Sequence, residues 1–69
     1  MSFAKRLKRI RELHGFSQTD LAEQLGVHFV TVSRWERGIA YPSADMLAAI
    51  ARFFLVSCDY LMCMDYSEL

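Results

Sequence analysis

The 69-residue sequence predicts an all-α fold, a compact domain of five short helices. Three observations support this prediction. Apolar residues recur at intervals of three and four, which is the spacing of one face of an α-helix. Glycine, serine and the single proline fall between these segments, where helices begin and end. The strict alternation of a half-buried strand is not seen.

The first helix is expected from Phe3 to about residue 14. Its predicted apolar stripe consists of Phe3, Leu7, Ile10 and Leu13. Gly15 is expected to end this helix, because glycine readily takes the left-handed conformation that closes one.

Two short helices should follow, separated by a turn at Gly26. Ser17 is a strong N-cap for the first of them, and Asp20 is a weaker version of the capping-box acid. The next helix is expected from about His28 to Arg37. The residues predicted to face inward are Leu21, Ala22, Leu25, Val32 and Trp35.

A serine is expected to cap the start of both the fourth and the fifth helix. Pro42 closes a loop and Ser43 caps the fourth helix. Ser57 caps a short fifth helix from Cys58 to about Met62. The apolar residues expected to face the core are Met46, Leu47, Ile50, Ala51, Phe54 and Leu61.

The length allows one domain, residues 1–69, with a core at about 3–62 and a short C-terminal tail at 63–69. No second domain that could bind a small-molecule effector is visible. No apolar run approaches the roughly 20 residues of a membrane helix, and the first residues lack the apolar stretch of a signal peptide. We therefore expect a cytoplasmic protein without a membrane partner.

The formal net charge is zero, but the charges are unevenly placed. Cations crowd the start of the chain, at Lys5, Arg6, Lys8, Arg9 and Arg11. Acids dominate its end, at Asp45, Asp59, Asp65 and Glu68. A molecule with one basic end can still face a polyanion, although a run of charge taken alone is more typical of a plain solvated surface.

Nothing in the sequence favours catalysis or a cofactor. It contains no Gly-rich phosphate loop and no nucleophile motif. Cys58 and Cys63 would lie about 140° apart on one helix, which suits neither a disulfide nor a shared metal. His14 and His28 lack the spacing of zinc ligands. We expect a non-enzyme with free thiols and no metal.

The most informative segment runs from Gln18 to Gly38, two short helices around one tight turn. The small Ala22 lets the helices approach closely, while Val27 and Val32 fix their crossing. Such a pair projects its second helix outward as a ridge, which the major groove, about 12 Å wide, can admit.

With this segment the sequence resembles the XRE/Cro/phage-repressor family of helix-turn-helix DNA-binding proteins. The resemblance covers about residues 3–62. The matching residues are Arg11, Gly15, Ser17-Gln18, Leu21-Ala22, Gly26-Val27, Thr31 to Gly38, Pro42-Ser43, Leu47, Ile50, Ala51 and Val56 to Leu61. The resemblance implies a lambda-repressor-like fold whose second helix crosses the DNA backbone and whose third helix reads the major groove.

The resemblance also implies roles for individual residues. Gln18 would hold a phosphate together with the first amides of its helix. Arg11 and Glu36 would join the first and third helices by a buried or half-buried salt bridge. Trp35 would pack in the core and would not stack on bases.

The start of the third helix departs from the family pattern. Phe29 and Val30 stand where family members commonly carry polar base-reading residues. The pair can pack on thymine methyl groups, or it can mark a protein interface. Arg34 is predicted to bind guanine O6 and N7, with a phosphate contact as the alternative. His28 replaces the usual Ser, Thr or Asp cap.

The remaining candidate contacts are assigned by position. Ser33 is grouped with the base-reading residues, and Thr31 with the phosphate contacts. The other candidate phosphate contacts are Arg37, Arg6, Arg9 and Tyr41. The apolar surplus predicted to form a homodimer interface consists of Tyr60, Met62, Met64 and Tyr66.

These residues favour a sequence-specific transcriptional regulator, a repressor, bound as a homodimer to an inverted repeat of double-stranded DNA. An alternative is an interaction module of the antitoxin or anti-repressor type, which keeps the fold without DNA readout.

Overall fold

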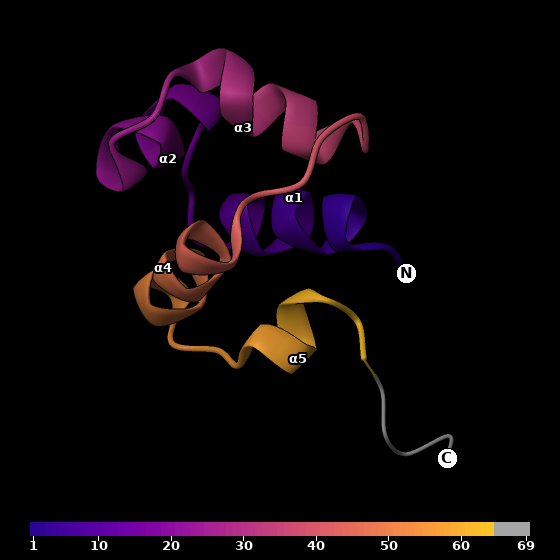
Figure 1. Cartoon of the computed structure of the whole chain (residues 1–69). Helices are drawn as coiled ribbons and strands as arrows, with labels where there is room; N and C mark the ends of the chain where they lie inside the picture. The colour runs from indigo at the N-terminus through magenta and orange to yellow at the C-terminus, as the bar shows by residue number, and fades with distance from the viewer. Residues whose placement is uncertain (65–69) are drawn as a thin grey trace.

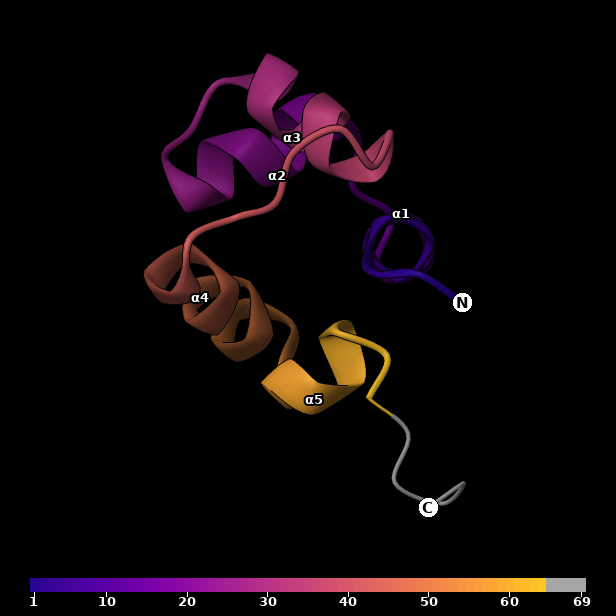
Figure 2. The same ribbon diagram turned by 45° about the vertical axis from the view of Figure 1, so that its right-hand side comes forward.

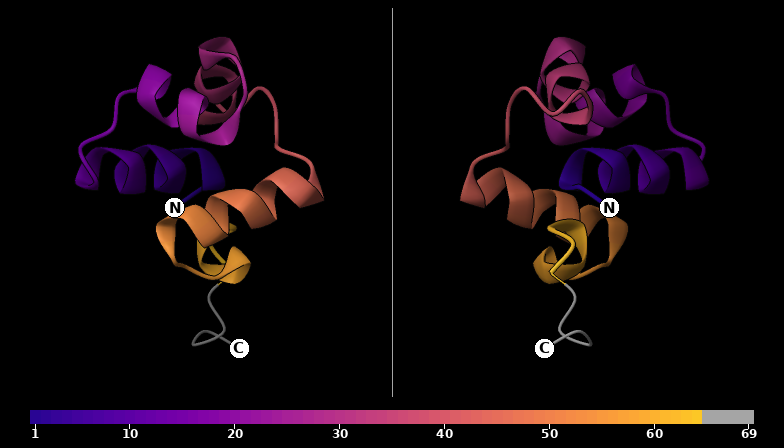
Figure 3. Two further views of the ribbon diagram at one scale, coloured as in Figure 1. Left: turned by 90° about the vertical axis from the view of Figure 1, so that its left-hand side faces the viewer. Right: turned by 90° about the vertical axis from the view of Figure 1, so that its right-hand side faces the viewer.

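The computed structural model describes residues 1–64, which form five helices and no strand (Figure 1). The helices are α1 (Phe3–Leu13), α2 (Gln18–Leu25), α3 (Phe29–Glu36), α4 (Ala44–Phe54) and α5 (Cys58–Leu61). α2 and α3 lie together at one end, α1 and α4 run through the middle, and α5 lies at the other end (Figure 3). The all-α class and the order of five helices are confirmed.

One apolar cluster connects all five helices. Its buried members are Phe3, Leu7, Ile10, Leu21, Ala22, Val32, Trp35, Ile50, Ala51, Phe54 and Leu61. Partly buried side chains such as Leu25 and Val27 pack against it. Trp35 belongs to this core, so its indole is not available as a platform for bases.

Every helix begins with a side chain that accepts a backbone hydrogen bond. At α2 the arrangement is reciprocal: Asp20 N donates to Ser17 Oγ at 3.0 Å, and Ser17 N donates to Asp20 Oδ2 at 3.0 Å. The predicted capping box is therefore complete. At α3 the cap is an imidazole, because Val30 N donates to His28 Nδ1 at 3.2 Å.

The turn between α2 and α3 depends on Gly26. Its φ of 72° lies in the left-handed region, which glycine occupies without steric cost. The chain then reverses so that Val27 N donates to Ala22 O at 3.0 Å. Ala22 is buried, and its small side chain lets α3 pack closely on α2.

The structure corrects the predicted apolar stripe of α1 at its last residue. Leu13 is 75% exposed, whereas Arg11 is only 7% exposed. Two residues turn a helix by about 200°, so the two side chains lie on nearly opposite sides. The last turn of α1 faces α3 with Arg11, because a carboxylate of α3 meets the guanidinium there, and Leu13 is left in solvent.

No helix in the part of the chain that the structure describes is both long and apolar enough to cross a membrane.

Candidate nucleic-acid interface

The outer side of α3 is open to solvent. α3 lies at the edge of the molecule, with α1 and α2 packed on its inner side (Figure 2). Phe29 and Val30 in its first turn are 48% and 43% exposed. Arg34 is also exposed, while Thr31 and Ser33 are partly buried. The predicted base-reading residues therefore lie on one short, accessible helix.

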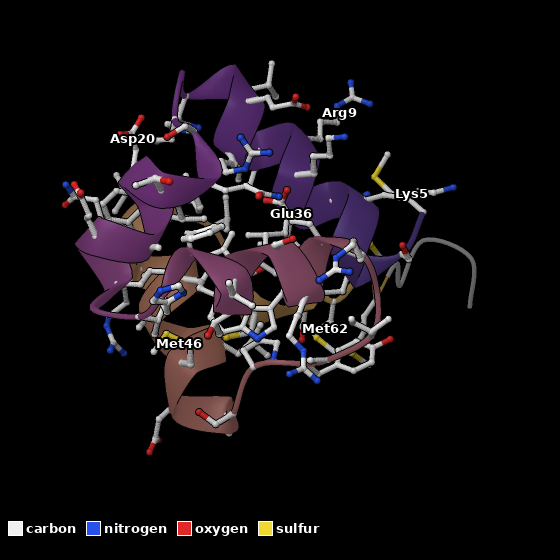
Figure 4. All side chains as sticks on the ribbon, turned by 90° about the horizontal axis from the view of Figure 1, so that it is seen from above. Lys5, Arg9, Asp20, Glu36, Met46 and Met62 are labelled. Carbon is white, nitrogen blue, oxygen red and sulfur yellow. The ribbon has the colours of Figure 1, made fainter. Side chains whose placement is uncertain are left out.

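The inner side of α3 carries a polar cluster. Glu36 accepts two hydrogen bonds from Arg11, from Nε at 2.7 Å and from Nη2 at 2.9 Å. Arg11 Nη1 donates to Phe16 O at 2.7 Å. Figure 4 shows Glu36 between α3 and α1. The ion pair therefore ties the first helix to the last turn of α3, as the resemblance implies.

The opposite charges of Arg11 and Glu36 stabilise each other at a largely buried position. The side chains of Arg11 and Glu36 are 9% and 3% exposed. The hydrogen bonds to Glu36 raise the pKa of the Arg11 guanidinium, although burial acts in the opposite direction. Both groups are satisfied, so the cost of desolvating them is offset by short, bidentate bonds.

Gln18 joins the same cluster from the first turn of α2. Its Nε2 donates to Glu36 Oε1 at 3.1 Å. An amide nitrogen carries two hydrogens, so one remains for the phosphate contact that the sequence suggests. The structure thus adds an inner partner for Gln18 that the sequence did not reveal, and the phosphate contact stays a prediction.

The basic residues of α1 differ in whether they contact the rest of the protein or extend into solvent. The guanidinium of Arg6 lies 4.2 Å from the ring centre of Tyr60, and its Nη1 donates to Tyr60 O at 2.8 Å. Arg6 thus anchors α5. Figure 4 shows Lys5 and Arg9 extending outward from α1, away from the protein. Arg9 is therefore available as a flanking cation, whereas Arg6 is engaged within the chain.

The end of α3 supplies two further predicted contacts. Arg37 is the exposed C-cap residue of α3. Tyr41, in the following loop, is also exposed, and its ring centre lies 6.0 Å from that of Phe3. Both positions are accessible to a ligand that lies along α3.

Sequence comparison decides the family. The sequence model described as helix-turn-helix matches residues 7–61. The chain belongs to this helix-turn-helix family. The match includes α2, α3 and the turn between them, the same segment that carries the resemblance to the XRE, Cro and phage-repressor proteins.

Relatives and solved structures agree with this assignment. The HTH-type transcriptional activator BcrR of Enterococcus faecalis is 39% identical over 62 residues, covering 90% of this chain and 30% of the relative. The HTH-type transcriptional regulator ImmR of Bacillus subtilis is 37% identical over 65 residues, covering 94% of this chain and 51% of the relative. These relatives are named as regulators of transcription, not as enzymes.

The fold is closely similar to that of the P22 c2 repressor protein, solved in complex with a synthetic operator. The TM-score is 0.87 at 29% identity, covering 94% of this chain and 98% of that one. The chain spans less than a third of the length of BcrR and about half that of ImmR.

In this helix-turn-helix protein, α5 and the segment after it carry three of the residues predicted to form a dimer surface. Tyr60, Met62 and Met64 are exposed there. Tyr66, the fourth residue of the predicted dimer surface, lies outside the described residues. Leu55 is 90% exposed and takes a left-handed conformation at φ 57°, which the sequence analysis did not predict.

The cysteines lie in the same part of the chain. Cys58 is exposed in the first turn of α5, and Cys63 is partly buried beyond that helix, at a left-handed φ of 59°. Both are free thiols. Among residues 1–64, no three His, Cys, Asp or Glu side chains are gathered in a way that could hold a metal ion.

Proposed function

We propose that this helix-turn-helix protein binds a specific site in double-stranded DNA through α3 and represses transcription as a homodimer on an inverted repeat. One observation carries the proposal. The outer side of α3 exposes Phe29, Val30 and Arg34, while its inner side is held by buried contacts to α1 and α2. A ridge of this kind can enter the major groove without first reorganising.

The proposed base contacts lie along that ridge. Arg34 would donate to O6 and N7 of a guanine, which is the commonest specific contact made by arginine. Phe29 and Val30 would pack on thymine methyl groups, and Ser33 would lie at a flanking base. Their exposure supports these contacts, because an apolar pair left in solvent gains free energy when a methyl group covers it.

The proposed phosphate contacts surround the ridge. Gln18 and Thr31 would bind the backbone near the first turns of α2 and α3, and Arg37 and Tyr41 near the end of α3. Arg9 would add a flanking cation. Arg6 would take part only by leaving Tyr60, so its contribution is expected to be the smallest.

The homodimer is proposed from the exposed apolar residues of α5 and of the segment after it. Tyr60, Met62 and Met64 are exposed there, and we extend the surface to Tyr66. Two copies would place their copies of α3 about 34 Å apart, one turn of duplex. Sedimentation with and without DNA tests this. A protein that stays monomeric at high concentration under both conditions would contradict the dimer.

Repression is proposed because a bound domain can block a promoter by occupancy alone. The structural relative from P22 is named a repressor, whereas BcrR is named an activator, so the sign needs its own measurement. The protein would act in the cytoplasm, where the DNA lies. A reporter gene behind the selected site should lose expression when the protein is present. A gain of expression would show that the protein activates transcription instead of repressing it.

Selection of bound sequences from random duplex tests the central claim. We expect an inverted repeat with half-sites about 10 base pairs apart, centre to centre. Binding should also weaken steeply as salt is raised, since phosphate contacts release counterions. Absence of binding to any duplex at low salt would overturn the proposal.

A second function is favoured by one observation, the exposed Phe29 and Val30 on a chain of zero net charge. Exposed apolar pairs also form the centres of protein interfaces. The protein would then be an interaction module of the antitoxin or anti-repressor type. Loss of partner binding in Phe29→Ala, together with no affinity for duplex, would favour this second function.

A further inference from the structure

The cap of α3 differs chemically from the caps of the other helices. Ser2, Ser17, Ser43 and Ser57 cap theirs through hydroxyl groups. His28 caps α3 through a ring nitrogen, since Val30 N donates to Nδ1 at 3.2 Å. Serine performs this task at least as well, so capping alone does not account for a histidine here.

The hydrogen bond to Nδ1 determines the protonation of the ring. A nitrogen that accepts from a backbone N–H carries no hydrogen, so in the neutral imidazole the hydrogen lies on Nε2. Nε2 is the outward-directed nitrogen, because the other one faces the amides of α3. Among residues 1–64, Nε2 donates to no protein acceptor.

The ring also lies beside the exposed apolar pair. The ring centres of His28 and Phe29 are 4.9 Å apart, with an angle of 31° between the planes. His28 is exposed, and Phe29 is 48% exposed. The imidazole is therefore held on two sides, by its bond to Val30 N and by the Phe29 ring, with one unused donor at the front of α3.

We propose that His28 is a DNA-contacting residue that donates a hydrogen bond from Nε2 to an acceptor atom of the duplex. The inference rests on the proposed function and adds a residue to its contacts. A neutral donor can bind a phosphate oxygen or the N7 of a purine. Because the ring is already oriented, little conformational freedom is lost when this bond forms.

The contact has a signature that separates it from the cationic contacts. A neutral donor releases no counterion, so its loss should lower affinity without changing the salt dependence. Loss of Arg37, in contrast, should reduce the salt slope by about one. A merely structural role of His28 would lower the melting temperature as well as the affinity.

The first measurement is the tautomer. Nitrogen NMR of the free protein at alkaline pH, where imidazole is neutral, should show the hydrogen of His28 on Nε2. A hydrogen on Nδ1 would overturn the inference, since the cap and the outward donor would both be lost.

The second measurement uses His28→Ser, which keeps a capping oxygen and removes the outward donor. We expect unchanged folding and an affinity for the selected site lowered about threefold to tenfold, the worth of one hydrogen bond. His14→Gln is the matched control. The ring of His14 packs on Phe54 of α4, so its loss should leave the affinity unchanged.

Altered duplexes then identify the acceptor. In one series each phosphate near the half-site is replaced by a methylphosphonate, and in the other each purine by its 7-deaza form. One replacement should weaken the unaltered protein but not His28→Ser. If every replacement weakens both proteins equally, the contact does not exist.

The two proposals fail in different ways. If the unaltered protein binds its site and His28→Ser binds equally well, only the role of His28 is overturned. If the unaltered protein binds no duplex at low salt, the proposed function fails and the contact fails with it.

Discussion

The inner side of α3 is closed by buried, fully paired groups, whereas its outer side presents unpaired groups to solvent. On the inner side, Glu36 accepts three hydrogen bonds from Arg11 and Gln18, and Trp35 is packed in the core. On the outer side, Phe29, Val30 and Arg34 are exposed. One helix of eight residues thus carries two opposite environments.

This difference shows how stability and recognition can be separated within one short helix. Residues on the inner side set where α3 lies, because their contacts reach α1 and α2. Residues on the outer side are free to vary, because few protein contacts depend on them. Substitutions on the two sides should therefore change different measured quantities.

The largest expected effect comes from the inner side. Glu36→Ala would leave the buried Arg11 without its partner, and removal of one partner of a buried ion pair costs about 3–5 kcal/mol. Denaturant unfolding measures this loss. For a domain of this size most of the folded population would disappear. A loss below about 1 kcal/mol would show that the pair is effectively solvated.

The next effect concerns recognition. Arg34→Ala should leave the free energy of unfolding within about 0.5 kcal/mol, because the side chain is exposed. It should cost about 1–3 kcal/mol of discrimination at one base pair. Competition binding with a single base change measures this. Arg52→Ala, an exposed arginine on α4, is the control that should change neither quantity.

If Arg34→Ala weakens binding to all duplexes equally, the residue contacts phosphate and the alternative role holds. If it destabilises the protein, the proposed separation between the two sides of α3 is wrong at this position.

A smaller effect is expected at the apolar pair. Replacing a contacted thymine by deoxyuridine removes one methyl group and should cost about 0.8 kcal/mol, the value of one buried methylene. The loss should vanish in Val30→Ala or Phe29→Ala, whichever touches that methyl. A uniform response of all thymines would argue that neither side chain reads one.

The smallest effect lies at the start of α2. Hydrogen bonds from the backbone and the hydroxyl of Ser17 lower the pKa of Asp20. A lowered pKa means that the folded state binds a proton less readily than the unfolded state. The stabilisation is thus full above about pH 4, the ordinary value for aspartate, and is lost as pH falls through the lower folded value.

Acid titration of the unfolding free energy checks this. Asp20→Asn should be less sensitive to acid below pH 4 than the unaltered protein. An equal acid response would mean that the capping box is not kept in solution. Of the caps of α2 and α3, only that of α2 should respond to acid through a carboxylate, because α3 has no acidic residue in its first turn.

The helix starts and stops were predictable because they depend on local chemistry. Ser17, Gly26 and Ser43 act through bonds or dihedral angles within a few residues of themselves. The resemblance also supplied the pairing of Arg11 with Glu36, which are 25 residues apart. Without it, an arginine inside an apolar stripe gives no sign of its partner.

The predictions from sequence were wrong or incomplete where tertiary contacts decide between arrangements that the local sequence favours equally. Leu13 fits the helical stripe, but only the position of α3 decides that Arg11 is the residue covered. Arg6 resembles any solvated cation until α5 packs beside it. The contact between Gln18 and Glu36 depends on how α2 crosses α3, which spacing alone does not give.

Substitution of Leu55 offers a way to raise the stability of the domain. It closes α4 in a left-handed conformation, which costs a residue with a side chain roughly 1–2 kcal/mol. Its side chain is almost entirely in solvent, so nothing visible within residues 1–64 repays that cost. Asparagine or glycine accepts the same dihedral angles more easily. This single exposed position, between α4 and α5, is therefore a place where a substitution can raise the melting temperature without changing α3.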